Sequence, residues 1–268
     1  KGRIMEYQKP FIYIDTNFSS ADGLFVKMAL DSFNFELVGL SSNKSYMSSA
    51  AAGENILGLV NNADLYLSVA KNYDDLESNF DEEIFTPVAD YLEDVDAFEN
   101  LYDLASDCGR LDIIASGDLG NIAKAIREFD DFIDFVDHIF LFIPDLKKLS
   151  KEDLTDLDLI LSSGIEIFAI DQKFANNFTL EEKDLTTIIK THPQMEKLLK
   201  SYDGEPLIGA LLLYLSQRPE AFIFEEAGLK INFDEKILER TESRPKAYMV
   251  NKVNEESFYD YLRAILCD

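Results

Sequence analysis

The chain has 268 residues, of which 47% are hydrophobic and 28% are charged, so it is long and apolar enough to fold around a large core. Its 25 Lys and Arg against 51 Asp and Glu give a net charge of −26, which would repel a nucleic-acid backbone. No apolar run approaches the length of a membrane span. We therefore expect neither a nucleic acid nor a membrane as a partner.

Cysteine and histidine are scarce in this sequence. Cys108 and Cys267 cannot build a disulfide framework, and two histidines exclude a histidine-rich zinc site. The lack of a disulfide framework is typical of proteins in a reducing compartment, so we predict a cytoplasmic protein. No linker rich in Pro, Gly or Ser interrupts the chain, so we predict a single domain over residues 1–268, with residues 1–10 as a tag remnant or a disordered start.

Short apolar runs alternate with segments of helical periodicity, which predicts parallel strands joined by helical crossovers. The predicted strands are residues 11–14, 36–40, 65–69, 112–115, 139–143 and 166–170. The predicted helices between them are residues 49–60, 119–126, 154–161 and 180–189. Asp118 is expected to cap the second of these helices, and Thr179 with Glu182 predicts a capping box for the last. The fold class is therefore α/β, with a mostly parallel, Rossmann-like sheet flanked by helices.

The alternation of apolar runs with helical segments changes after Pro193. Residues 195–202 and 206–215 have helical spacing, residues 229–233 and 247–253 are strand-like, and residues 256–266 predict a closing helix. We interpret this part as a C-terminal helical and two-strand appendage to the main sheet. The acidic residues 74–83 predict a surface loop.

Ligands of open α/β sheets bind where strands end and helices begin, so the strand ends are the places to search. Asp15, Asn17 and Asp22 follow the first predicted strand within one loop. Asp15 comes directly after the apolar run and is expected to be partly desolvated, which is costly unless it is paired, hydrogen-bonded or metal-bound. Asp22 either caps the following helix or serves a site.

At this loop the chain resembles a known family. Residues 11–30 are similar to the signature of the inosine-uridine-preferring nucleoside hydrolases, in which a hydrophobic strand precedes Asp-x-Asp-Pro-Gly-x-Asp-Asp, an Ala and a helix. Further similar segments occur in the order of that family: residues 36–57, 113–123, 165–171, 205–206 and 247–266. The resemblance implies the nucleoside hydrolase fold, hydrolysis of the N-glycosidic bond of ribonucleosides, a nucleoside-like ligand and a homo-oligomer.

Within the signature, the resemblance places Asp15 and Asn17 at the catalytic loop. The family has a supporting Asp at position 15 and a calcium-binding, water-activating Asp at position 17, where this chain has Asn17. The Asp that holds ribose is replaced by Ala21, whereas the second calcium-binding Asp is kept as Asp22. Two of the four carboxylates are thus absent from this chain.

The remaining site positions are also carried over from the resemblance. The backbone carbonyl of Ser116 and the side chain of Glu205 fall on calcium ligands, so the implied calcium site is Asn17, Asp22, Ser116 and Glu205. Tyr46 and Gly204 fall on substrate-binding positions, Gly204 replacing the His that assists the leaving base. Four oxygen donors completed by water are an acceptable calcium shell, although Asp15 and Asp22 could instead only bind loop amides.

These departures bear directly on activity. An amide at Asn17 cannot accept a proton, and general-base assistance contributes about 10²–10⁴-fold to a rate. We therefore predict a divergent nucleoside hydrolase with weak or lost activity on ordinary nucleosides. The alternative is a non-catalytic ligand-binding or assembly protein on the same fold. An aspartate-nucleophile phosphatase is less suitable, because it needs a second Asp where Asn17 stands.

Overall fold

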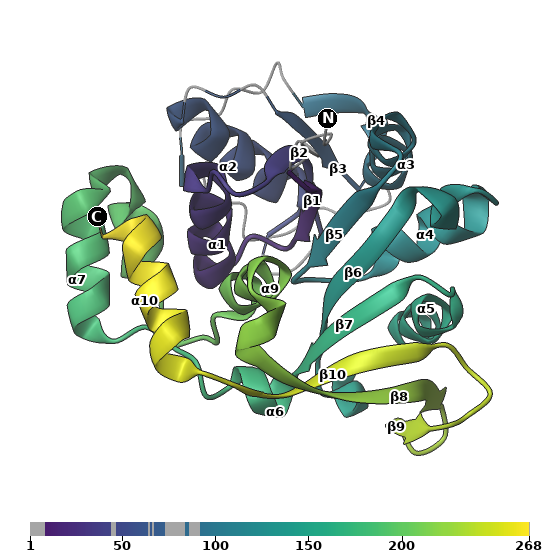
Figure 1. The fold of residues 1–268 in the computed structure, drawn as a ribbon. Coiled ribbons are helices and arrows are strands. Elements are labelled where there is room, and N and C mark those ends of the chain that lie inside the picture. Colours follow the sequence, from purple (N-terminus) through teal and green to yellow (C-terminus); the bar gives the residue numbers. More distant parts are fainter. Residues whose placement is uncertain are drawn as a thin grey trace, which may run out of the picture.

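The computed structural model describes residues 9–43, 47–63, 65, 67–72, 84, 85 and 92–267. Within these residues one sheet has the strand order β4-β3-β2-β1-β5-β6-β7-β10-β8-β9 (Figure 1). The strands are β1 Phe11–Thr16, β2 Glu36–Ser42, β3 Ser68–Lys71, β4 Leu92–Asp96, β5 Leu111–Ala115, β6 Val136–Ile143, β7 Glu166–Asp171, β8 Phe222–Asn232, β9 Ile237–Arg240 and β10 Lys246–Val253. From β4 to β10 neighbouring strands are parallel, and β8 and β9 are antiparallel to their neighbours.

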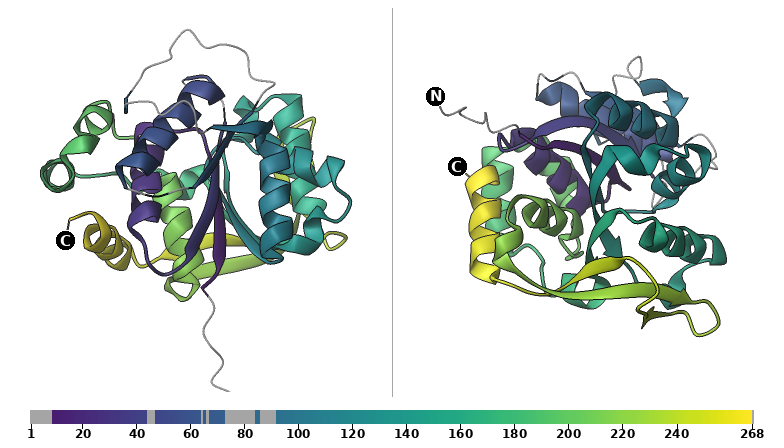
Figure 2. Two further views of the ribbon diagram at one scale, coloured as in Figure 1. Left: turned by 90° about the horizontal axis from the view of Figure 1, so that it is seen from above. Right: turned by 45° about the vertical axis from the view of Figure 1, so that its right-hand side comes forward.

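Helices cover both faces of this sheet, as the left view of Figure 2 shows. The α-helices are α1 Ser20–Asp31, α2 Ser49–Asn62, α3 Ala97–Cys108, α4 Gly120–Glu128, α5 Lys151–Ser162, α6 Gln172–Ala175, α7 Glu182–Thr191, α8 Glu196–Lys200, α9 Ile208–Gln217 and α10 Glu255–Leu266. Short 3₁₀ helices are Phe132–Phe135, Leu146–Lys148, Pro193–Met195 and Pro219–Ala221. Helices α1, α2, α9 and α10 bury one core and α3, α4 and α5 bury the other.

The alternation of the central strands explains these two cores. Ile12 and Ile14 of β1 pack toward α1 and α9, whereas Tyr13 between them packs toward α3. All three side chains are fully buried, which is why the sequence shows a continuous apolar run rather than an alternating one. The predicted α/β class and the six central strands are confirmed, although β3 lies a few residues later than the predicted 65–69.

The C-terminal strands are part of the main sheet. β10 pairs in parallel with β7, and β8 pairs with β10 and with β9 in antiparallel fashion. The predicted strand 229–233 is the second half of the longer β8, and β4 and β9 were not predicted. β4 has the sequence Leu-Glu-Asp-Val-Asp and lies at the sheet edge, where half-exposed carboxylates break the apolar pattern.

One predicted helix start is wrong, and a second is confirmed only in part, because Asp118 binds the first N–H of α4 without being its N-cap. α7 begins at Glu182 after Glu181, without a side-chain capping bond, so Thr179 and Glu182 form no capping box. α4 has Leu119 at its N-cap, and Asp118 instead accepts the Gly120 N–H at 2.6 Å. In both places several polar residues could begin the helix, and tertiary packing selects among them.

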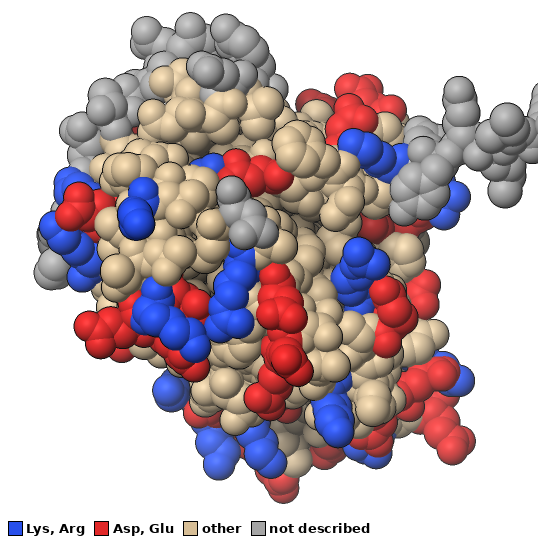
Figure 3. All heavy atoms as spheres, turned by 60° about the vertical axis from the view of Figure 1, so that its left-hand side comes forward, with Lys and Arg blue, Asp and Glu red and all other residues tan. Residues whose placement is uncertain are grey.

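The predicted loop at residues 74–83 lies outside the described residues, as does Tyr46. Acidic and basic side chains are interspersed over the face shown in Figure 3. Among the described residues, no helix has the length and apolar character needed to cross a membrane.

Candidate functional site

The strand order reverses at β1, which is where a ligand site is expected in an open α/β sheet. From β1 the chain proceeds outward through β2, β3 and β4 and then returns to β5 on the other side of β1. Asp15, near the carboxyl end of β1, lies beside Ser41 of β2 and Ala115 of β5 in the strand register. The loops after these three strands therefore converge on Asp15.

Asp15 is fully buried, as its position after an apolar run predicted. Its Oδ1 accepts hydrogen bonds from the Ser41 hydroxyl and from Asn121 Nδ2, the latter at 3.0 Å. Its Oδ2 is buried and has no hydrogen-bond partner among the residues that the structure describes. Burial raises the pKa of Asp15 to about 6, and the hydrogen bonds from Ser41 and Asn121 oppose that rise.

A chain of side-chain amides supports Asp15. Asn121 Nδ2 also donates to Asn43 Oδ1 at 2.7 Å, and Asn43 Nδ2 donates to the Asp118 carbonyl at 3.0 Å. Asn72 Nδ2 donates to Asn121 Oδ1 at 3.3 Å. The sequence places Asn43 and Asn121 after strands, but it gives no sign that their amides meet, because 78 positions separate them.

The loop after Asp15 turns sharply into α1. Phe18 has a φ of +54°, in the left-handed region, and its side chain is buried. Ser19 is the N-cap: its hydroxyl accepts the Asp22 N–H at 3.2 Å, and Asp22 Oδ2 accepts the Ser19 N–H at 3.4 Å. This capping box makes Asp22 the third helical residue rather than the N-cap. Burial raises the pKa of Asp22, which is opposed by hydrogen bonds from Ser116 and Ser19.

Asn17 lies against the loop after β5. A Cβ at Gly117 would lie 3.0 Å from the Asn17 backbone nitrogen and 3.2 Å from its Cβ, so any larger residue would require Asn17 to shift by a few tenths of an ångström. Within the described part of the chain, the buried Asn17 Oδ1 has no hydrogen-bond partner. The neighbouring Ser116 hydroxyl donates to Thr16 Oγ1 at 3.0 Å, which joins the two loops.

Glu205 reaches this site from the loop before α9. Its Oε1 accepts the Ala21 N–H at 2.7 Å, at the amino end of α1, where a negative charge is favoured. Burial raises its pKa, and the Ala21 hydrogen bond opposes that rise. Gly204 is exposed, with a φ of +91°, and a Cβ there would meet nothing within 4 Å.

The structure thus brings together five predicted site residues near the carboxyl ends of β1 and β5: Asp15, Asn17, Asp22, Ser116 and Glu205. Asp15 Oδ2 and Asn17 Oδ1, which lack hydrogen-bond partners among the described residues, are both acceptor oxygens. A hard cation or a hydrogen-bond donor satisfies such atoms, so the donor set fits calcium or magnesium. Among the described residues, however, Asp15, Asp22 and Glu205 do not form a tight three-carboxylate cluster.

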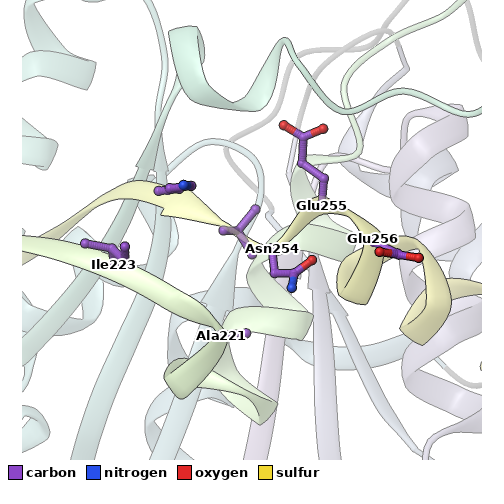
Figure 4. A pocket seen from close by; sticks show the side chains of 7 residues that line it. Ala221, Ile223, Asn254, Glu255 and Glu256 are labelled. Carbon is purple, nitrogen blue, oxygen red and sulfur yellow. The ribbon is translucent and has the colours of Figure 1, made fainter.

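A different hollow, of about 520 Å³, lies beside the carboxyl end of β10 (Figure 4). It is lined by Ile223, Lys252 and residues 253–256. Asn254 uses its side-chain oxygen to accept the Ser257 N–H at the start of α10. This hollow has no converging set of unpartnered polar atoms, so it is a weaker candidate.

The chain is similar in fold to several solved structures, although its sequence identity to them is low. No protein-family model and no curated protein sequence matches the chain. A purine-preferring ribonucleoside hydrolase from Gardnerella vaginalis superposes with a TM-score of 0.80 at 16% identity, covering 96% of this chain and 98% of that one. The fold is that of the nucleoside hydrolases. An inosine-uridine preferring nucleoside hydrolase from Bacillus anthracis (0.79, 13%) and a plant nucleoside hydrolase (0.77, 16%) each align over 96% of this chain and 99% of theirs.

Proposed function

We propose that this chain is a divergent, cation-dependent N-glycoside hydrolase with weak or lost activity on ordinary nucleosides. The observation that supports it best is the pair of buried, unpartnered oxygens of Asp15 and Asn17 at the strand-order reversal. The nucleoside hydrolase fold supports the class of reaction, and the donor set supports the cation.

Calcium would be held by the side chains of Asn17, Asp22 and Glu205 and by the Ser116 carbonyl. When bound, it would supply positive charge beside a water molecule and a sugar hydroxyl. Asp15 lies deeper, fixed by Ser41 and Asn121, and is suited to orient groups around the cation. Burial raises the pKa of Asp22 and that of Glu205, and a bound cation would lower both by favouring the charged carboxylates.

Slow turnover follows from three side chains. The Asn17 amide cannot accept a proton from water, Ala21 has no carboxylate to hold a ribose hydroxyl, and Gly204 offers no imidazole to the leaving base. Loss of a general base alone costs about 10²–10⁴-fold in rate. From the same resemblance, we propose that the ligand is nucleoside-like and that Tyr46 contributes to its binding site.

The alternative is a non-catalytic ligand-binding or assembly protein on the same fold. It is supported by Glu205, whose carboxylate oxygen is already engaged by the Ala21 N–H at 2.7 Å. The amides of Asn43 and Asn121 are likewise used within the protein. In this case the site holds a ligand without cleaving it.

The experiment restores the two missing carboxylates. Hydrolysis of inosine and uridine is measured with calcium for the wild type, for Asn17→Asp/Ala21→Asp and for Asn34→Asp/Ala264→Asp. The last variant makes the same two changes at exposed positions. We expect barely detectable wild-type turnover and a rise of about 10²-fold or more in the first variant only.

Two results would contradict the proposal. Wild-type turnover in the usual enzyme range of about 1–10³ s⁻¹ would show that the activity is intact. A folded, calcium-binding Asn17→Asp/Ala21→Asp variant without any gain would favour the non-catalytic alternative. Circular dichroism and calcium titration of each variant separate these results from misfolding.

A further inference from the structure

A second group of polar side chains lies near the amino ends of β5 and β6, at the opposite end of the strands from Asp15. Asp112 of β5 and His138 of β6 are partners in the parallel register, and His138 Nδ1 lies 2.7 Å from Asp112 Oδ1. Asp137 precedes His138. Ligand atoms of these three side chains all lie within 4.8 Å of one another. An imidazole and two carboxylates from neighbouring strands therefore converge on one point.

This group opens into a hollow of about 410 Å³, which an ion can enter from solvent. The side chain of Asp112 is 13% exposed, that of Asp137 31% and that of His138 34%. Cys108, at the end of α3, lines the same hollow. The ligand atoms are thus held by the sheet and yet remain accessible.

The charges around the group are mostly negative. Glu166 Oε2 lies 3.4 Å from His138 Nε2, so a third carboxylate borders the imidazole. Arg110 is the main opposing charge, its guanidinium lying 2.8 Å from Asp137 Oδ2, and Lys9 also lines the hollow. The Arg110 side chain is 79% exposed and can leave Asp137 at small cost.

We propose that Asp112, Asp137 and His138 form a binding site for a divalent transition-metal ion such as Zn²⁺. Imidazole favours zinc over calcium or magnesium, and three protein ligands leave a coordination position for water. Zinc–ligand bonds of about 2 Å separate tetrahedral ligand atoms by about 3.3 Å. A small rotation of the half-exposed His138 ring provides that spacing, with the ion replacing the proton shared with Asp112. This metal site is independent of the function proposed for the site around Asp15.

The competing explanation is an ordinary network of ion pairs, His138 with Asp112 and Arg110 with Asp137. Both explanations predict that the network stabilises the fold. Only the metal site predicts saturable binding of a transition metal that depends on His138 and becomes stronger when Arg110 is removed.

The first measurement is a calorimetric titration of the EDTA-treated, dialysed protein with Zn²⁺ at about pH 8, in excess calcium to fill oxygen-only sites. We expect one zinc per chain, and His138→Gln to weaken binding about 100-fold or more. His192→Gln, which removes the other histidine, is the matched control and should bind as the wild type does. Absence of saturable binding, or equal binding by His138→Gln, would overturn the proposal.

The second measurement uses Arg110→Gln, a change at an exposed side chain that should leave the fold intact even where His138→Gln does not. Removing the guanidinium frees Asp137 and lowers the positive potential, so zinc affinity should rise several-fold. An unchanged or lower affinity would contradict the assignment. Co²⁺ added in place of Zn²⁺ should give visible absorption that is absent in His138→Gln.

Discussion

Asp15 is a carboxyl group that the fold buries at the end of β1 and surrounds with donors from distant parts of the chain. Its two hydrogen-bond donors, Ser41 and Asn121, lie 26 and 106 positions away. The burial of Asp15 was predictable from the apolar run before it. Its partners were not, because they depend on which strands become neighbours and on the register between them.

For the carboxyl groups of the site, the family resemblance predicted positions but not hydrogen-bond partners. Asp22 and Glu205 were predicted as calcium ligands, and the structure places both at the start of α1. Asp22 there completes a capping box with Ser19, and Glu205 accepts the Ala21 N–H. The two side chains that we propose as calcium ligands therefore also bind backbone N–H groups at the start of α1, which residue identity alone does not reveal.

The pKa of Asp15 leads to a prediction about pH. Its folded-state pKa of about 6 lies above the ordinary value of 3.8 for Asp, so the folded protein binds this proton more tightly than the unfolded chain does. The stabilisation is fully present below about pH 4 and is lost as the pH rises through about 6. Two pKa units correspond to about 3 kcal/mol.

We therefore expect the free energy of unfolding of the metal-free protein to fall between about pH 4 and pH 7. Asp15→Asn should flatten this dependence, since an amide does not titrate. Denaturant unfolding in EDTA at several pH values measures the difference. Parallel pH profiles for the wild type and Asp15→Asn would show that Asp15 titrates normally. Asp22 and Glu205 contribute in the same direction, so the variant retains part of the slope.

Among the elements, the central strands and most helices followed from the sequence, whereas α3, the edge strands and the helix starts did not. β1, β5, β6 and β7 are buried on both faces, and their apolar runs identify them. β9 is a short edge strand whose pairing with β8 depends on the hairpin rather than on hydrophobicity. The joining of β10 to β7 is a long-range pairing that periodicity cannot predict.

Two capping boxes allow a matched test of α1. Ser19 caps α1 with Asp22, and Ser150 caps α5 with Asp153 in the same geometry. Ser19→Ala and Ser150→Ala should each lower the free energy of unfolding by about 1 kcal/mol. Only Ser19→Ala should also weaken calcium binding, because it releases the Asp22 carboxylate from its fixed position. Equal calcium affinity in the two variants would mean that this capping box has only a structural role.

At the scale of the whole molecule, the sheet separates two groups of polar side chains. Asp15 lies near the carboxyl end of β1, close to the start of α1 where Asp22 and Glu205 meet, whereas Asp112 and His138 lie near the amino ends of β5 and β6. With 51 acidic residues in the chain, composition cannot distinguish these few from the solvated majority. Strand order does, because it decides which carboxyls become buried beside one another.

The central claim is that the loop after β1 binds a calcium ion, and calorimetric titration with Ca²⁺ tests it most directly. The wild type is compared with Asp22→Asn and with Asp153→Asn, which makes the same change in the capping box of α5. We predict saturable binding of one calcium ion by the wild type and by Asp153→Asn, weakened about 100-fold or more in Asp22→Asn. A wild type that binds no calcium, or an Asp22→Asn variant that binds it equally well, would contradict the account.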